Sequence, residues 1–600
     1  MALRFSGSTE ELRALLTEAV QDGDWKEINP NQHQFRHENG GILNWYPSTG
    51  VINFQGQPSG RDALQEQVTS LLQQQPSKPL PDAESIPTQT REALLSSEFP
   101  ARVKSEPDNP ALPDRKLDLR NFPDSEIIIG LVGAVGTDFS LVIRPLADRL
   151  RIAGYDTTEI RVSQDVIPRI IKVDETRVNE ATRITRLMNA GDLARKQSSD
   201  NGILATGVAA QIAEMRKSSG RVMPRHAFIV NSLKHPDEVH RLRQIYPRGF
   251  HLFGVHPDES IRLHYMKQKG IDDQDIVRLI DRDQDEHVPY GQRVNDTFHM
   301  SDFFVRLEND SLKLGNSIVR ICEILFGNPY KTPTFEEFAM FLAFTASLRS
   351  ADLSRQVGAV VTNGEEILST GANDCPKFEG GLYWPEYNSQ THAFEDKSDG
   401  RDYRRGEDSN KIEQRKIIDG ILGRAKEHGL DPEKLREVLE ESRIRDLTEY
   451  GRVVHAEMEA LLSCARNNVN TRGGQLFSTT FPCHNCAKHI VAAGIKRVVF
   501  IEPYQKSKAA EFHSDSISVG FSPSPNTVHF EPFVGIGPRR FFDLFSIRLG
   551  AGYELKRKTN DGLVVDWSLS QTSKLRLQML PGSYLDLEQE AKAQFENYLL

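Results

Sequence analysis

The chain has 600 residues and a formal net charge of -10 at pH 7, with 84 acidic and 74 basic side chains. This length predicts about two to four domains, and the acidic balance excludes a chain-wide basic field for tight duplex binding. Five cysteines are too few for a disulfide framework and favour a reducing, cytoplasmic location. The sequence shows no leader sequence and no continuous apolar stretch long enough to span a bilayer, so we expect no membrane partner.

The first 75 residues predict a small α+β domain. Residues 41–46 and 51–54 alternate as two strands around a turn, and helical patterns flank them. The sequences Asn-Gly-Gly at 39–41 and Phe-Gln-Gly at 54–56 resemble a small domain, shaped like half of a TATA-binding protein, that precedes the catalytic part of some bacterial ribonucleases H. Such domains handle nucleic acid.

Three aromatic side chains of this domain allow two interpretations. They can form a stacking platform for bases, or they can be the core of a generic interaction or oligomerisation module. The residues are Trp45, Tyr46 and Phe54.

The next segment, residues 76–120, is rich in proline and polar residues and follows a glutamine run. This composition predicts a semi-rigid linker. Residues 115–120 can equally be a strand that enters the following domain.

The segment 121–330 opens with an apolar strand, a glycine-rich turn and a helical pattern, the order in which glycine amides can bind phosphate. A Walker loop places Lys and Ser/Thr after its last glycine, whereas Thr137 and Asp138 come here, so the expected cation is missing. The candidate nucleotide-binding residues of this degenerate P-loop are Gly130, Gly133, Gly136 and Thr137.

Residues 227–239 and 250–255 resemble the strand and helix pattern of P-loop nucleotide and dephospho-coenzyme-A kinases. Asn231 stands where those kinases place Asp. The Walker lysine and this Asp are both missing, which favours a kinase-like fold without phosphoryl transfer. Retained nucleotide binding and a pure scaffold both stay open.

The last domain, residues 331–600, contains the clearest motif. His455 and Glu457 precede Cys483 and Cys486 in the order H-x-E…P-C-x-x-C, which resembles that of zinc deaminases acting on cytosine or adenine. Pro482 is expected to open a helix that carries both cysteines on its first turn. A Cys2His site leaves a fourth zinc position for water, which is the mark of a catalytic zinc.

Glu457 lies two residues beyond the histidine ligand, close to the metal but outside its ligand set. We expect it to move protons from water to the ring and to the leaving amine. The alternatives for a C-x-x-C pair alone are a structural zinc knuckle and a redox pair. A zinc-stabilised binding protein would leave Glu457 without a use.

Residues 346–350, 357–360 and 370–376 resemble the deoxycytidylate deaminase family, whose members act on free deoxycytidine nucleotides. The resemblance implies that Asn373 holds the deoxyribose and the pyrimidine edge. A turn-forming role is the alternative for this asparagine.

Further substrate-binding candidates flank the motif. Arg349 suits a free nucleotide, Tyr504 can line the base pocket, and Lys506 can meet phosphate; an exposed lysine loop is equally plausible. A second zinc at Cys375 and His392, as in some deoxycytidylate deaminases, has weak support.

The whole pattern predicts a multi-domain α/β protein: a P-loop kinase-like parallel sheet, then a cytidine-deaminase-like α/β/α sandwich, with the small α+β domain in front. Over residues 120–560 it resembles the bacterial anti-phage dCTP/dCMP deaminases. That resemblance implies nucleotide depletion, an inhibitory non-coding RNA or nucleotide effector, and a homo-oligomer. A polynucleotide (RNA or single-stranded DNA) cytidine deaminase is the alternative, but its expected run of aromatics interleaved with Arg and Lys is missing.

Overall fold

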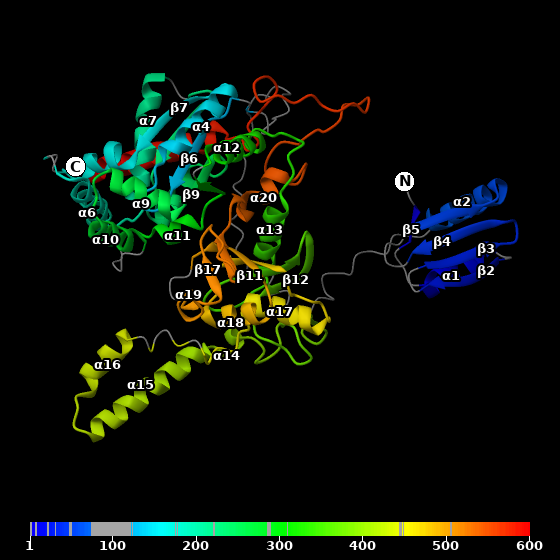
Figure 1. Cartoon of the computed structure of the whole chain (residues 1–600). Helices are drawn as coiled ribbons and strands as arrows, with labels where there is room; N and C mark the ends of the chain where they lie inside the picture. Colours follow the sequence, from blue (N-terminus) through cyan, green and yellow to red (C-terminus); the bar gives the residue numbers. More distant parts are fainter. Residues whose placement is uncertain are drawn as a thin grey trace, which may run out of the picture. The chain divides into compact units, whose positions relative to one another are not determined.

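The chain divides into two compact units, Met1–Arg115 and Lys116–Leu600 (Figure 1). No described helix is long and apolar enough to cross a membrane. The predicted linker at 76–120 lies outside the described residues. The computed structural model describes the whole chain apart from residues 1–2, 6–8, 21–22, 30–31, 47–50, 74–121, 123, 174–175, 177, 220–221, 285–289, 309, 443, 445–446, 448, 504–506 and 600.

The first unit is an antiparallel sheet, in the order β1-β5-β4-β3-β2, with two helices packed on it. The helices are α1 (Thr9–Ala19) and α2 (Pro58–Gln73). The strands are β1 (Leu3–Arg4), β2 (Gly23–Asn29), β3 (Gln32–His37), β4 (Gly41–Tyr46) and β5 (Val51–Gly56).

Trp45 belongs to the core of this unit. Its side chain is 1% exposed and packs with Leu43 and Leu16, and its indole N–H donates to the carbonyl oxygen of Phe5 at 3.4 Å. A stacking platform needs an exposed aromatic face, so Trp45 cannot contribute to one. Phe54 is half-buried, and the Tyr46 side chain lies outside the described part of the chain.

The second unit begins with a six-stranded sheet in the order β19-β10-β9-β6-β8-β7. All neighbouring strands are parallel except β10 and β19. All six residues of the central strand β6 are buried, as expected for a parallel strand covered on both faces. The strands are β6 (Ile127–Val132), β7 (Asp156–Arg161), β8 (His226–Asn231), β9 (Phe250–Pro257), β10 (Phe303–Leu307) and β19 (Gly535–Ile536).

Helices cover both faces of this first parallel sheet. On one face lie α4 (Ser140–Ile152) and α12 (Ser311–Leu325). On the other lie α7 (Ile203–Ser219), α8 (Pro236–Ile245) and α21 (Leu585–Leu599). Further helices are α5 (Ile167–Ile170), α6 (Glu180–Ser198), α9 (Glu259–Gln268), α10 (Asp273–Gln284) and α11 (Val294–Phe298).

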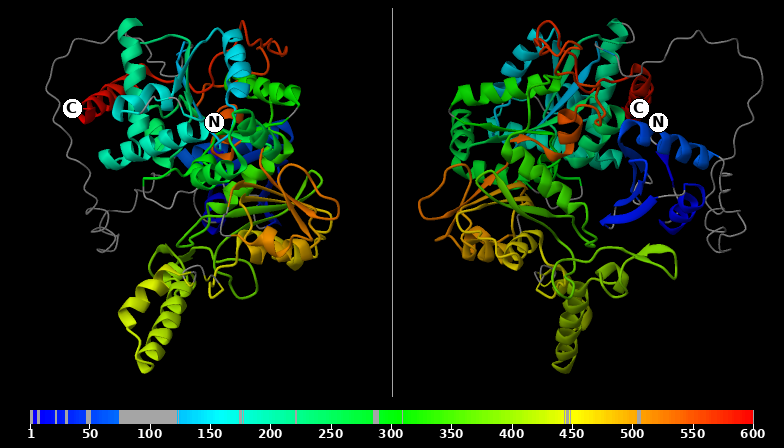
Figure 2. Two further views of the ribbon diagram at one scale, coloured as in Figure 1. Left: turned by 60° about the vertical axis from the view of Figure 1, so that its left-hand side comes forward. Right: turned by 90° about the vertical axis from the view of Figure 1, so that its right-hand side faces the viewer.

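The C-terminal segment returns to the first sheet of this unit. Leu575 and Leu577 are buried in the core that contains α12, and Phe595 on α21 is buried in the core that contains α7. Figures 1 and 2 show this segment, in red, beside the cyan elements of the first sheet. The end of the chain, which sequence analysis grouped with residues 331–600, therefore packs on an element of the preceding region.

The second sheet of this unit has the order β12-β11-β15-β16-β18-β17. Helix α13 (Phe335–Ser347) packs on one face, and α17 (Ala456–Arg466) and α18 (His484–Ala492) pack on the other. The hairpin predicted from Asn363-Gly364 is present between β11 and β12. The strands are β11 (Gly358–Asn363), β12 (Glu366–Ala372), β15 (Gln475–Thr480), β16 (Arg497–Glu502), β17 (Ile517–Val519) and β18 (Val528–Pro532).

A polar insertion separates β12 from α17. Helices α15 and α16 form a hairpin that extends away from the second sheet (Figure 2). The chain is thus a multi-domain α/β protein with several sheets. The elements of the insertion are β13 (Glu386–Asn388), β14 (Ala393–Glu395), α14 (Asp402–Arg405), α15 (Ser409–Glu427) and α16 (Pro432–Glu441), and two short helices, α19 (Ala509–Phe512) and α20 (Pro538–Phe545), follow later in the chain.

Candidate metal centre

His455 and Glu457 lie at the start of α17. His455 is the N-cap residue, in extended backbone (φ -70, ψ 153), and Glu457 is in the first turn. The preceding Val454 forms a β-bridge with Asp374, which fixes where the helix begins. The imidazole therefore leaves the chain at a defined point beside the sheet, and the carboxylate lies on the inward side of the same turn.

The two cysteines lie at the start of α18. Sequence analysis expects Pro482 to open this helix, but α18 begins at His484 and Cys483 is its N-cap. Cys483 is in extended backbone, and its Sγ accepts the backbone N–H of Cys486 at 3.5 Å. The thiol thus takes the place of the usual Ser or Asp cap, and this delays the helix by two residues.

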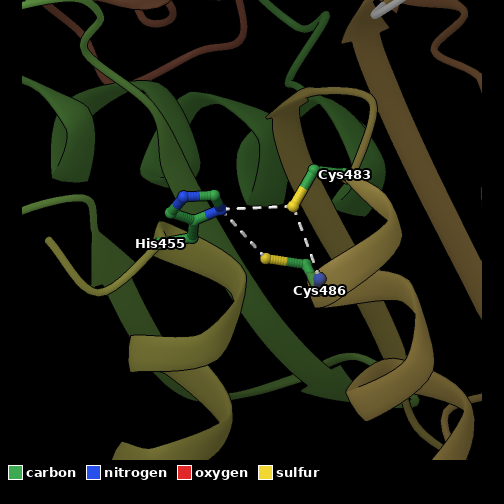
Figure 3. A group of neighbouring side chains, drawn as sticks. All are labelled: His455, Cys483 and Cys486. Atoms are coloured by element: carbon green, nitrogen blue, oxygen red, sulfur yellow. Dashed lines mark hydrogen bonds between the residues drawn. The ribbon is translucent and has the colours of Figure 1, made fainter. Parts of the chain in front are cut away.

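The three side chains converge on one point (Figure 3). His455 Nδ1 lies 3.3 Å from Cys483 Sγ and 3.4 Å from Cys486 Sγ, and all three ligand atoms lie within 4.8 Å of one another. Tetrahedral zinc with ordinary Zn–S and Zn–N bonds places N and S about 3.6 Å apart. The donor set therefore fits zinc, and a three-residue set leaves a fourth position for another ligand.

Hydrogen bonds within the cluster shift the pKa values of its three ligands in different directions. Hydrogen bonding, first with Cys486 and then with His455, lowers the pKa of the Cys483 thiol to about 3. The hydrogen bond with Cys483 raises the pKa of His455 to about 9. The hydrogen bond with Cys483, and then burial, raise the pKa of the Cys486 thiol well above its ordinary value. Cys483 is therefore the thiolate of the cluster, which is the form that binds metal, and binding of a cation would release the protons of His455 and Cys486.

Glu457 is 4% exposed and lies beside the ligands. Its Oε2 accepts the thiol of Cys486 at 3.5 Å, and its Oε1 accepts the hydroxyl of Ser478 at 3.5 Å. Burial raises the pKa of this carboxyl. A carboxyl whose pKa is raised by burial holds a proton more readily than an exposed one, as a group that accepts and passes on protons requires.

Ser478 is a residue that sequence analysis missed. It is fully buried on β15, two residues beyond Leu476, which packs in the core with α17. The signal was available, because period-two alternation places 476 and 478 on the same face of a strand. Ser478 is a polar residue on a strand face that otherwise packs against the helix of Glu457. Such a residue is expected to be a hydrogen-bond partner of the Glu457 carboxylate.

Asn373 holds a neighbouring loop. Its Oδ1 accepts the backbone N–H of Val357 at 2.7 Å, and its Nδ2 donates to the carbonyl oxygen of Arg355 at 2.8 Å. This geometry is that of the loop-forming alternative. The predicted contact with a deoxyribose stays a prediction.

Arg349 lies in a different setting from the three ligands. Its guanidinium stacks on the ring of Trp384, 3.6 Å from the ring centroid, and donates to the carbonyl oxygen of Tyr383. Tyr504 and Lys506 lie outside the described residues. Contacts of these three residues with a substrate therefore stay predictions.

The second-zinc hypothesis gains nothing from the geometry. The Cys375 side chain is buried and donates to Asp402 at 3.6 Å, whereas His392 is exposed and contacts the Tyr387 hydroxyl. Within the described ranges, the one group of three metal-ligating side chains is that of His455, Cys483 and Cys486.

The glycine-rich turn follows β6 in the first sheet of the second unit. Gly130 lies inside β6, where a Cβ would come within 2.9 Å of Leu233 and Phe250, so packing explains this glycine. Gly133, Gly136 and Thr137 lie in the turn itself, and Gly136 has a φ of +86. Nucleotide binding by these residues stays a prediction.

Comparison with known proteins finds similarity to the cytidine and deoxycytidylate deaminases. The model of the cytidine and deoxycytidylate deaminase zinc-binding region matches residues 333–502, which include the three ligands. The deoxycytidylate deaminase of Enterobacteria phage T4 is 31% identical over 169 residues, 28% of this chain and 77% of that protein. The deoxycytidylate deaminase of Homo sapiens is 30% identical over 178 residues, 29% of this chain and 68% of that protein. The crystal structure of the dCMP deaminase from cyanophage S-TIM5 in complex with dCMP and dUMP covers 34% of this chain and 100% of its own, at 19% identity and a TM-score of 0.20.

Proposed function

The chain belongs to the cytidine and deoxycytidylate deaminase family, and from that premise we propose that it converts free deoxycytidine nucleotides, dCTP or dCMP, to deoxyuridine nucleotides. One observation carries the proposal: three zinc ligands converge beside a buried carboxylate, Glu457, that is outside the group of ligands. A structural zinc site has no use for such a group.

His455, Cys483 and Cys486 would hold zinc, which would supply the Lewis acid that makes a water molecule nucleophilic near neutral pH. Glu457 accepts the first proton of that water as its oxygen bonds to C4 of the cytosine ring, and delivers the proton to N3. Glu457 then carries the second proton, from the hydroxyl on C4, to the amino group. The C4–N4 bond breaks, ammonia leaves and the C4 carbonyl forms.

Ser478 keeps one oxygen of Glu457 in place, since its hydroxyl donates to Oε1 from the sheet side. Cys486 contacts the other oxygen from the ligand side. The carboxylate is thus fixed between the zinc ligands and the sheet, where a ring bound beside the ion meets it. Asn373, Arg349, Tyr504 and Lys506 are the proposed contacts to sugar, base and phosphate.

A panel of substrates tests this function against its alternatives. The full-length protein is incubated with dCTP, dCDP, dCMP, CTP and single-stranded DNA, and the uracil products are separated by chromatography. We expect conversion of at least one deoxycytidine nucleotide. Conversion of the polynucleotide alone would favour a polynucleotide deaminase, and conversion of none would favour a zinc-stabilised binding protein.

The role in anti-phage defence is a proposal of its own, and it depends on the resemblance of the whole domain combination. A parallel sheet with a glycine-rich turn after its central strand, joined to a deaminase sheet, supports the kinase-like interpretation. The effector, an RNA or a nucleotide, and the homo-oligomer belong to the same proposal. A bacterial host that expresses the protein should keep less dCTP during phage infection and release fewer phage than a host with Glu457→Gln. Equal phage yields would contradict it.

A further inference from the structure

The glycine-rich turn lies where α/β proteins bind ligands, at the carboxyl end of a central parallel strand. It joins β6 to α4, and the backbone amides of such a turn favour anions together with the start of the helix that follows. The sequence of the turn lacks the lysine that a Walker loop places next to phosphate.

A carboxylate of this chain occupies the turn. Oδ2 of Asp283, near the end of α10, accepts the backbone N–H of Val135 at 2.6 Å. The Asp283 side chain is 1% exposed, so water does not share this charge. An amide of the turn that could bind phosphate is therefore bound to a buried carboxylate instead.

A lysine from the loop after β8 supplies the missing cation. Nζ of Lys234, in the loop after β8, donates to Asp283 Oδ1 at 2.7 Å and to the carbonyl oxygen of Gly133 at 2.9 Å. Lys234 thus connects the turn to the same carboxylate. The turn therefore meets an ammonium group and a carboxylate, the two kinds of charge that the lysine and the phosphate supply in a phosphate loop.

The start of α4 is neutralised in the same way. Asp138 Oδ1 accepts the backbone N–H of Ser140 at 3.1 Å and its hydroxyl at 2.6 Å. A second anionic group of the chain therefore covers the helix end. Within the described residues, the turn and the helix start both have an internal carboxylate partner.

One cation beside the turn is less well satisfied. The buried Nε of Arg262, on α9, has no hydrogen-bond partner among the described residues. Its side chain packs against the turn, because a Cβ on Gly136 would lie 2.9 Å from Arg262 Cγ. Removal of the Asp283 carboxylate would leave two cations, Lys234 and Arg262, around an empty anion position.

We propose that Asp283 is an internal substitute for a phosphate group and closes the glycine-rich turn to nucleotides. An outside phosphate must displace a buried carboxylate that already has a backbone N–H and an ammonium group as partners, and must leave that carboxylate unpaired. The first sheet of the second unit is then a scaffold for the deaminase. Any nucleotide effector acts through a different surface of the protein.

Anion rescue tests the proposal. The full-length protein and its Asp283→Ala variant are unfolded thermally in phosphate and in chloride at equal ionic strength. Asp283→Ala should lower the midpoint in chloride, and millimolar phosphate should raise it again by about 1–2 °C, a small shift because the turn belongs to a large unit, Lys116–Leu600. The unsubstituted protein should show no such shift from the turn.

Two variants assign the rescue to the turn. In the double variant Asp283→Ala/Lys234→Met the phosphate shift should vanish, since one of the cations is gone. Phosphate binding at the deaminase site would be the same in the single and the double variant, so it cancels when the two are compared. The control is Asp310→Ala, which removes the carboxylate that caps α12. The hydrogen bonds of that cap come from backbone N–H groups and not from a cationic side chain. Phosphate should therefore not rescue the Asp310→Ala variant.

Two results would overturn the proposal. One is a phosphate-induced rise in the unfolding midpoint of Asp283→Ala that is no larger than that of Asp310→Ala. Asp283→Asn takes the place of Asp283→Ala if the alanine variant does not fold. The other is a phosphate shift in the otherwise unchanged protein that Lys234→Met abolishes, because the turn would then be open with Asp283 in place.

Discussion

The zinc cluster and the glycine-rich turn are both built at the starts of helices, but their polar groups have different partners. At the zinc cluster, His455 Nδ1 and two sulfur atoms lie within 4.8 Å of one another and leave a ligand position. At the turn, the Asp283 carboxylate binds the Val135 N–H and the Lys234 ammonium group. A motif therefore predicts a ligand only where the chain does not supply that ligand itself.

Removal of a zinc ligand should have the largest effect. Cys483→Ala deletes a sulfur and the cap of α18, so we expect zinc content to fall from one to near zero per chain and deamination to fall by at least about 10³-fold. Metal analysis by mass spectrometry, with the assay on dCMP and dCTP, measures both. Cys464→Ala is the control, since Cys464 lies on α17, is buried in the core and is not one of the three ligands. A Cys483→Ala protein with full zinc would break the comparison.

A buried charge cluster between α7, α21 and the start of β6, in the second unit, should show the next largest effect. Arg216 donates to Glu588 at 2.8 and 2.9 Å and pairs with Glu126, and all three side chains are at most 4% exposed. Arg216→Met leaves two buried carboxylates unpaired and should lower the free energy of unfolding by about 3–5 kcal/mol. Urea denaturation followed by circular dichroism measures it.

The matched control for this cluster is an exposed pair. Arg151 and Asp148 form an ion pair with both side chains about 70% exposed, so Arg151→Met should change the free energy of unfolding by no more than about 0.5 kcal/mol. If Arg216→Met and Arg151→Met lowered the free energy of unfolding by the same amount, buried charge pairing would not be what stabilises this part of the second unit.

His251 should give a smaller, pH-dependent effect. Burial, with Arg540 and Arg243 nearby, lowers its pKa well below the ordinary value. Since an unfolded histidine binds a proton below about pH 6.5 and the folded one does not, stability falls as the pH falls through that value, by about 2 kcal/mol at pH 5. His251→Phe should remove that part of the pH dependence in urea titrations at pH 7.5 and pH 5. His264→Phe, at an exposed site, should leave it unchanged.

The parts of the structure that sequence analysis predicted are local in the chain. The ligands His455, Cys483 and Cys486 follow from short motifs at helix starts, and the β11–β12 hairpin follows from Asn363-Gly364. Each depends on residues a few positions apart. Such spacing survives folding because a helix turn or a tight turn fixes it.

The parts that sequence analysis missed join distant segments. Asp283 is 148 residues from Val135, and Glu588 is 372 residues from Arg216. No local periodicity shows which loop meets which helix end. The absent Walker lysine was visible after Gly136, but its replacement by Lys234 depends on the pairing of β6 with β8. These contacts depend on which segments the fold brings together, and a local sequence pattern does not show that.

The measurement that tests the central claim most directly is the zinc content and deamination rate of Glu457→Gln, made side by side with the unsubstituted protein. The amide keeps the shape of the side chain but cannot carry protons, so we predict one zinc per chain and a rate on dCMP and dCTP reduced by about 10²–10⁴-fold. A Glu457→Gln protein that holds zinc and deaminates at the normal rate would contradict the account.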